Sequence, residues 1–266
     1  MRMVSEATPG GRAAPAPLPA GGSDSPGVPW WGVVSALAAP LLLVTGWTLA
    51  ATLQPRPFNA VAGTVSALAA LGAADRWVMT LAFAAAGACE VVTGLALRPA
   101  AAPGRLILMA GGVAGVLVAA NPEHAGGSLA HACWAGVGFA ALVTWPGGAW
   151  RRGLSVPWGL RPTVSAVVTG VMIGLLAWFL AELVTRGGQV GLAERIMGVV
   201  QAGWPLAVVL SCRLGRPGTR TVDAGAGTEH AARRPARARY LRVRHAWSAG
   251  PPGAVRYRLA GRYRAD

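Results

Sequence analysis

The sequence contains no lysine, and charged residues make up only 13% of its 266 positions. That share is about half of what a soluble globular domain carries. Hydrophobic residues account for 53% of the chain, so too few polar groups remain to cover the surface of a soluble protein. The composition excludes an ordinary cytosolic enzyme domain, a coiled coil and a fully disordered chain. It is typical of an integral membrane protein.

Several familiar chemical signatures are also missing from the sequence. The three cysteines, Cys89, Cys133 and Cys212, are scattered and have neither the pairing of a disulfide scaffold nor the spacing of a metal site. The chain has no glycine-rich phosphate loop and no nucleophile elbow. It also lacks the helix-borne charges of a voltage sensor and the matched broken helices of a transporter. We therefore expect neither a cofactor nor a bound metal.

The positive charge lies mostly at one end of the chain. The formal net charge is +14, all 24 cations are arginines, and 13 of them follow residue 212. Because the charge belongs to a tail and not to a folded face, we do not expect nucleic acid as a partner. Residues 213–266 are predicted to be a basic cytoplasmic tail, either lying on anionic membrane lipids or solvated and disordered. Residues 1–28, rich in Gly, Pro and Ala, are predicted to be a disordered arm.

Six stretches between these two tails are long and apolar enough to cross a membrane. A helix needs roughly 20 apolar residues to span the hydrocarbon core, and in lipid its backbone groups must bond to one another. The predicted class is thus an all-α integral membrane protein with a six-helix transmembrane bundle over residues 29–212. The predicted spans are 30–52, 77–97, 105–124, 129–147, 162–183 and 192–212.

Arginines predict the orientation of this bundle, because cytoplasmic loops carry an excess of them. Without the basic tail, seven arginines lie on the side of the two termini and four on the opposite side. Both termini are therefore predicted to be cytoplasmic. On the outer side, residues 53–76 place Phe58, Val61, Val65 and Leu68 at helical spacing, which predicts a short helix at the membrane surface.

Glu90 is the ionisable residue that we expect deepest in the membrane. It lies 13 residues after Trp77, which corresponds to about 20 Å along a helix. Ionisable groups at such depth are costly and frequently functional. Glu90 is either a general acid for a lipid-soluble substrate or a neutral acid that is hydrogen-bonded to Ser or Thr across the bundle.

A second polar group lies in the outer turn from Asn121 to His131. Glu123, His124 and His131 provide ligand types that zinc accepts, but their spacing matches no zinc signature. Ser128 stands three residues before His131, which is the position of a residue that caps a helix. The turn is therefore either a hydrogen-bonded cap or a metal site. Since His131 is expected near the surface, it should not share a metal with Glu90.

The remaining candidates belong to the last two spans. Glu182, Glu194 and Arg195 are expected to form an ion pair at the ends of these helices. Most tryptophans fall near predicted interfaces, where their amphipathic rings are favoured. Trp204 and others could instead face inward and line a pocket that stabilises a cation.

Three segments together resemble the domain-of-unknown-function family 998, which comprises bacterial multi-helix membrane proteins. They are "NAVAGTVSALAALGAADRW", "NPEHAGGSLAHACWAGVGFAAL" and "GLAERIMGVVQAGWPLAVVL". The resemblance covers about residues 30–212 and implies a bundle in the bacterial inner membrane. The family's motif positions correspond here to Ser66, to Pro122 with Glu123, to His131 and to Arg195. The resemblance implies no reaction.

The sequence thus leaves several functions open. The first is a membrane protein whose outward-facing polar site, with Ser66, Asn121, Glu123, His131 and Arg195, binds lipid headgroups or a partner. The second is an enzyme on a lipid-soluble substrate, such as an acid-initiated prenyl (terpene) cyclase in which Glu90 supplies the proton. Its Trp rings, Trp204 among them, would stabilise the carbocation. The third is a hydrolase with a metal held by Glu123, His124 and His131.

Overall fold

A computed structural model describes residues 27–124 and 127–215 of the chain. The predicted disordered arm, up to residue 26, and the predicted basic tail, from residue 216, lie outside these residues. The described part forms six long helices and two short 3₁₀ helices. They are α1 (Trp30–Thr52), η1 (Ser66–Ala69), α2 (Trp77–Ala96), α3 (Ala102–Ala120), α4 (Leu129–Ala149), η2 (Trp158–Leu160), α5 (Pro162–Thr185) and α6 (Val190–Leu214).

All six long helices of the described residues are candidate membrane spans by length and composition. They contain 19 to 25 residues, and the mean hydropathy of their most apolar windows lies between 1.2 and 2.2. At 1.5 Å per residue even the shortest reaches about 28 Å, close to the hydrocarbon thickness. These helices confirm the prediction of an all-α chain with six apolar spans.

The third span differs most from its predicted bounds of 105–124. Helix α3 begins at Ala102, with Pro103 in its first turn, where proline's missing N–H is tolerated. It ends at Ala120, because Asn121 precedes Pro122 and a residue before proline is disfavoured in helical conformation. Proline placement therefore sets both ends of this helix.

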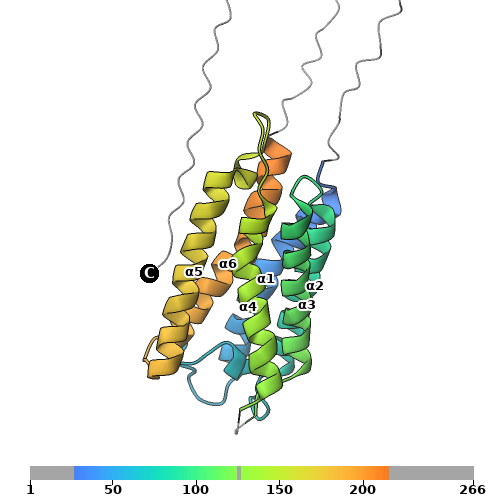
Figure 1. The fold of residues 1–266 in the computed structure, drawn as a ribbon. Helices are drawn as coiled ribbons and strands as arrows, with labels where there is room; N and C mark the ends of the chain where they lie inside the picture. The colour runs from blue at the N-terminus through green and yellow to red at the C-terminus, as the bar shows by residue number, and fades with distance from the viewer. Residues whose placement is uncertain (1–26, 125–126, 216–266) are drawn as a thin grey trace, which may run out of the picture. The chain divides into compact units, whose positions relative to one another are not determined.

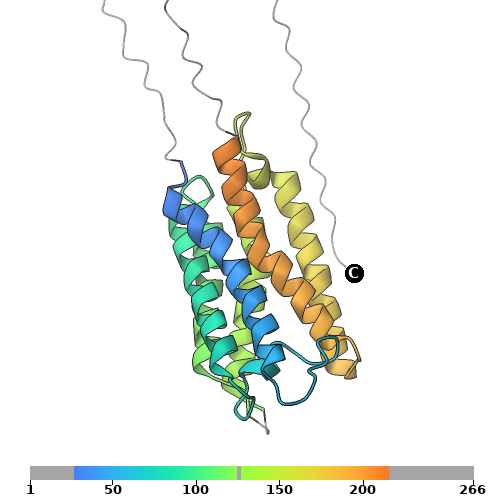
Figure 2. The same cartoon turned by 180° about the vertical axis from the view of Figure 1, so that it is seen from behind.

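The six long helices of the described part pack in sequence order into a closed ring. Each helix lies against the next one, and α6 returns to pack on α1 (Figures 1 and 2). Helix α5 contacts α4 and α6 and leaves large apolar residues uncovered. These include Val167, Val171, Ile173, Leu183 and Val184. Such an uncovered apolar face fits contact with lipid.

Glycine and alanine allow the helices to approach one another closely. A side chain at Gly112 of α3 would collide with the backbone oxygen of Gly87 in α2, and one at Gly104 would collide with the backbone of Ala149 in α4. Small residues are the usual means by which membrane helices pack without a hydrophobic driving force between them. Small residues such as Gly104 and Gly112 pack the helices in this way here.

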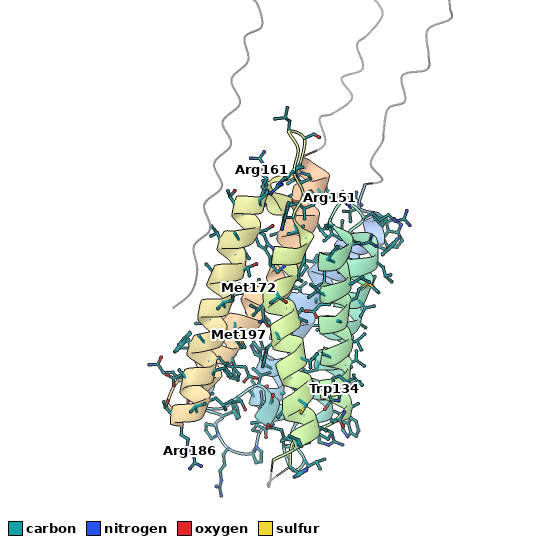
Figure 3. The ribbon with its side chains drawn as sticks, viewed as in Figure 1. Trp134, Arg151, Arg161, Met172, Arg186 and Met197 are labelled. Atoms are coloured by element: carbon teal, nitrogen blue, oxygen red, sulfur yellow. The ribbon has the colours of Figure 1, made fainter. Side chains whose placement is uncertain are left out.

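The helix connections gather at two ends of the bundle. Connections 97–101 and 150–161 lie at one end with Trp30 and Leu214, and we call this the terminal end. The loop 53–76, the α3–α4 connection and the α5–α6 connection lie at the other, which we call the site end. Figure 3 shows Arg151 and Arg161 at the terminal end and Arg186 at the site end.

Candidate functional site

The loop 53–76 does not form the predicted helix at the membrane surface. Asn59 accepts hydrogen bonds from the backbone N–H groups of Val61 at 3.0 Å and Ala62 at 3.3 Å, and this local turn competes with a helix. The loop's helical element is η1, only four residues long. Leu68 of η1 is buried against the bundle, so this part of the loop packs inward.

Helix α6 holds this loop in place. The backbone N–H of Leu192 donates to the oxygen of Val61 at 3.0 Å. The Nη1 atom of Arg195 donates to the backbone oxygens of Ala60 at 2.7 Å, Gly63 at 2.8 Å and Gly191 at 2.9 Å. Charge-assisted bonds of this kind are stronger than neutral ones. Arg195 therefore fixes the loop 53–76 to helix α6.

The predicted ion pair among Glu182, Glu194 and Arg195 is wrong within the described residues. The Oε2 atom of Glu194 instead accepts the backbone N–H of Val65 at 2.6 Å, and Glu182 accepts the N–H of Gln189 at 2.9 Å. Both acids satisfy backbone donors that their neighbouring loops leave free, which explains why neither turns to the arginine.

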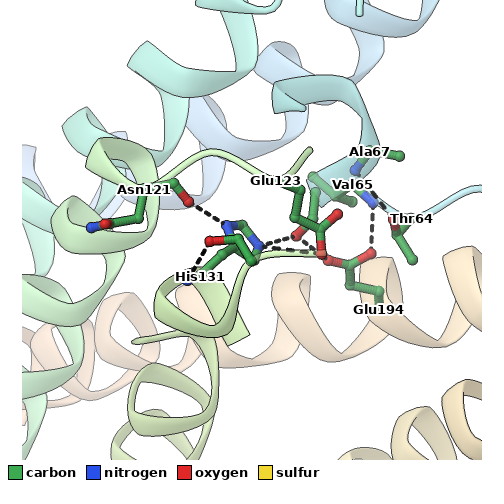
Figure 4. Close-up of polar contacts among 9 residues, drawn as sticks. Thr64, Val65, Ala67, Asn121, Glu123, His131 and Glu194 are labelled. Atoms are coloured by element: carbon green, nitrogen blue, oxygen red, sulfur yellow. Dashed lines mark hydrogen bonds and ion pairs between the residues drawn. The ribbon is translucent and has the colours of Figure 1, made fainter. Parts of the chain in front are cut away.

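His131 is the centre of the polar cluster at the site end, and its side chain is almost fully buried (Figure 4). Its Nδ1 lies 2.9 Å from the backbone oxygen of Asn121, and its Nε2 lies 3.2 Å from Oγ of Ser66. The Oε1 atom of Glu123 is 3.9 Å from the same Nε2. Ser128 accepts the backbone N–H of His131 at 3.3 Å, which confirms the predicted cap of α4.

The α3–α4 connection also holds the loop 53–76 through its backbone. The oxygen of Glu123 accepts the N–H of Leu71 at 2.7 Å, while the Glu123 side chain remains 40% exposed. The side chain of Asn121 points elsewhere and donates to the oxygen of Leu117 at 2.8 Å. Asn121 thus contacts the cluster through its backbone alone.

The three ligands of the third hypothesis do not gather at one point in the described residues. In residues 27–124 and 127–215, no three His, Cys, Asp or Glu side chains gather closely enough to hold a metal ion. His131 contacts Glu123 and Ser66, and His124 does not join them. The turn is the hydrogen-bonded cap that the sequence left as the alternative.

A cavity of about 110 Å³ lies within the bundle. Helices α1, α2, α3, α4 and α6 line it together with Val65 and Ser66. Most of its wall is apolar, and four polar side chains interrupt it: Ser66, Glu90, Glu194 and Gln201. Ser66 therefore belongs to both the His131 cluster and the cavity, and it connects the predicted outer site to the predicted deep acid.

Glu90 and Gln201 are buried residues of this wall whose side chains make no hydrogen bond among the described residues. Glu90 is only 6% exposed, and among the described residues it forms none of the predicted bonds to Ser or Thr. The Nε2 atom of Gln201 is buried without a hydrogen-bond partner among the described residues. Gln201 was not among the site residues predicted from the sequence, although a lone amide in an apolar span indicates a functional position.

Trp204 lies apart from the cavity. Its ring meets that of Trp158 edge to face at 5.9 Å, and it packs on the apolar cluster of the terminal end. The aromatic residues of the cavity wall are Trp47, Phe83 and Phe139. Trp204 is therefore not placed to line a cation-stabilising pocket with Glu90.

Six candidate spans in the described residues, with a polar cluster at one end of the bundle, define a multi-pass membrane protein. Residues 37–211 match the model of a family described as a protein of unknown function (DUF998). The chain belongs to the DUF998 family, as the three sequence segments indicated. No curated protein and no solved structure shows a significant match to it.

Proposed function

We propose that this protein binds the polar end of an amphiphilic, membrane-soluble ligand in the cavity between the helices. The observation that carries the proposal is the cavity itself, in which four polar side chains converge within apolar walls. Ligand pockets have this composition, with a few placed polar groups that orient the ligand.

The unpaired polar groups support this proposal. A buried donor or acceptor without a partner costs about 1–3 kcal/mol. Gln201 is 2% exposed and its amide nitrogen has no partner among the described residues, while Glu90 is nearly as deeply buried. A ligand that bonds to these groups would offset that cost, whereas a purely apolar ligand would not.

The volume of the cavity limits which part of the ligand is enclosed. An engineered cavity of about 150 Å³ holds a benzene molecule. A space of about 110 Å³ therefore encloses a headgroup or a short stretch of chain. The rest of an amphiphilic ligand would lie in the membrane, in contact with the apolar outer faces of the helices.

We place the site end outside and both termini in the cytoplasm of a bacterial inner membrane. Arg98, Arg105, Arg151, Arg152, Arg161 and Arg213 are the arginines nearest the terminal end, where the described residues include no acid. At the site end, four arginines stand beside Asp75, Glu123, Glu182 and Glu194. This asymmetry follows the positive-inside rule.

Gln201→Leu tests the proposal. We expect the affinity of the variant for the bound ligand to fall at least about tenfold, because one lost hydrogen bond corresponds to roughly 1.4 kcal/mol. The protein should fold as well as before, since the substitution removes an unpaired amide. The measurement is native mass spectrometry of the full-length protein purified in mild detergent, which identifies the ligand by its mass.

The matched control is Ser165→Ala in α5. Ser165 is also buried, and its oxygen has no hydrogen-bond partner in the part of the chain that the structure describes, but it does not line the cavity. It should retain the wild-type ligand. The proposal would be contradicted if Gln201→Leu and wild type carried equal amounts of the ligand. It would also be contradicted if the wild type carried no lipid and instead copurified with a stoichiometric protein partner.

A second candidate is an acid-initiated cyclase of a prenyl chain. Its support is that Glu90, without a hydrogen-bond partner among the described residues, shares the cavity with the rings of Trp47, Phe83 and Phe139. Aromatic faces stabilise cations. Lipid extracts of cells that express wild type would then contain a product that is missing with Glu90→Gln. A product that persists in the variant would exclude Glu90 as the acid.

A further inference from the structure

We infer that Ser66 is a nucleophile that His131 activates, and that the two form the catalytic dyad of a hydrolase for an ester of the amphiphilic ligand. This inference rests on the proposed function for the position of the substrate. Its evidence is a separate set of contacts, which lie in the loop 53–76 and the α3–α4 connection.

The first step is the tautomer of His131. A backbone oxygen only accepts hydrogen bonds, so the Nδ1 atom, 2.9 Å from the oxygen of Asn121, carries the proton. The Nε2 atom of the neutral ring then has a free lone pair. The Nε2 atom is 3.2 Å from Oγ of Ser66, which is close enough for a base to accept a proton from a nucleophile.

The second step is how firmly the pair is held. His131 is 3% exposed and lies in the first turn of α4, which Ser128 caps. Ser66 begins η1, whose Leu68 and Ala69 are buried against the bundle. A nucleophile and a base held on anchored elements keep their relative geometry, which catalysis requires.

The third step concerns the carboxylates beside the dyad. The hydroxyl of Ser66 has one proton and two neighbouring acceptors, and His131 is nearer than Oε1 of Glu194 at 3.4 Å. The other carboxylate oxygen of Glu194, Oε2, accepts the N–H of Val65. Glu123, with Oε1 3.9 Å from Nε2, would stabilise the imidazolium that forms when His131 takes the proton.

The fourth step is access to the substrate. Ser66 lines the cavity, so an ester carbonyl placed there meets its hydroxyl. Gln201, whose Nε2 amide has no hydrogen-bond partner among the described residues, lies in the same wall. The apolar wall between them suits an acyl chain.

The reaction proceeds in two balanced halves. Ser66 Oγ bonds to the carbonyl carbon, His131 takes its proton, and the carbon–oxygen bond to the alcohol breaks as His131 returns the proton to the leaving oxygen. Water then attacks the acyl-serine ester, again losing a proton to His131, which returns it to Ser66. One ester and one water yield one carboxylic acid and one alcohol.

The test is covalent labelling with a fluorophosphonate that carries a long alkyl chain. The full-length protein is labelled in native membranes, and the modified peptide is found by mass spectrometry. Labelling forms an Oγ–P bond and releases fluoride. We expect wild type to be labelled on Ser66, Ser66→Ala to be unlabelled, and His131→Gln to react at least about 10²-fold more slowly, as for the loss of a general base.

The control is Ser35→Ala, a buried serine of α1 that bonds to Thr93 and does not line the cavity. It should be labelled like wild type. Wild-type protein that stays unlabelled on Ser66, or labelling that His131→Gln leaves unchanged, would overturn the dyad. Loss of the ligand from Gln201→Leu would leave the proposed binding function standing in either case, so the two failures are distinguishable.

Discussion

The variant Gly191→Ala is expected to lose the ordered site end of the bundle. A Cβ atom at this position would collide with the backbone oxygen of Gly63 and would lie 2.8 Å from the oxygen of Ala60. The obstacle is backbone, which cannot move aside as a flexible side chain can. The loop would have to withdraw from α6, and its bonds to Leu192 and Arg195 would break.

We expect this change to lower the free energy of unfolding by at least the 1–3 kcal/mol that overpacking usually costs. The measurement is thermal unfolding of the purified full-length protein in detergent. Gly203→Ala, on the same helix, is the matched control, because nothing lies within 4 Å of its added Cβ. An alanine there should be neutral or slightly stabilising in a helix. Equal melting temperatures for Gly191→Ala and Gly203→Ala would contradict the close contact.

The loop at the site end also explains how the polar cluster acquires its geometry. It is fixed to α6 by Arg195, to Glu194 by the N–H of Val65 and to the α3–α4 connection by Leu71. These three attachments surround Ser66 and set its distance from His131. A polar site supported in this way is organised before any ligand arrives, which reduces the entropy lost on binding.

The helices could be predicted from the sequence because their signal is local. A run of about 20 apolar residues needs no partner elsewhere in the chain to be recognised as a span. Proline and capping residues, such as Pro103 and Ser128, also act within one turn of the residues they affect. The helix predicted in the loop 53–76 is wrong because helical spacing of apolar residues says nothing about the Asn59 side chain, which accepts hydrogen bonds from the backbone in a local turn.

The site could be predicted only in part, because its contacts join distant positions. Ser66 and His131 are 65 residues apart, and Val65 and Glu194 are 129 apart. The sequence placed Ser66, Glu123 and His131 on the same side of the membrane, but not within bonding distance. The expected pairing of Glu194 with Arg195 was wrong for the same reason, since each residue bonds to the backbone of a loop that lies far away in the sequence.

Glu90 illustrates a different limit. Its depth in an apolar span marked it as exceptional, and it is indeed buried. That its carboxyl forms no hydrogen bond among the described residues could not be predicted, because the neighbours of a buried side chain depend on how the helices pack. The cavity that Glu90 shares with Ser66 and Gln201 is a product of packing among five helices, so no single segment encodes it.

The second large effect is expected from filling the cavity with Gly198→Leu. Gly198 lines the cavity from α6, and the nearest atoms to its added Cβ are the Leu43 side chain at 3.5 Å and the Trp47 ring at 3.8 Å. These are ordinary contacts for the Cβ atom, and because Gly198 lines the cavity, the rest of the leucine side chain would occupy space that the ligand would use. The protein should fold, and the bound amphiphile should be lost.

Native mass spectrometry of Gly198→Leu, with Gly203→Leu as its control, tests the central claim most directly. Both substitutions add the same side chain to α6, but Gly203 does not line the cavity. With both variants melting near the wild-type temperature, we expect ligand to remain on Gly203→Leu and to fall at least tenfold on Gly198→Leu. A ligand that stays bound to both variants at wild-type occupancy would show that it does not lie in this cavity.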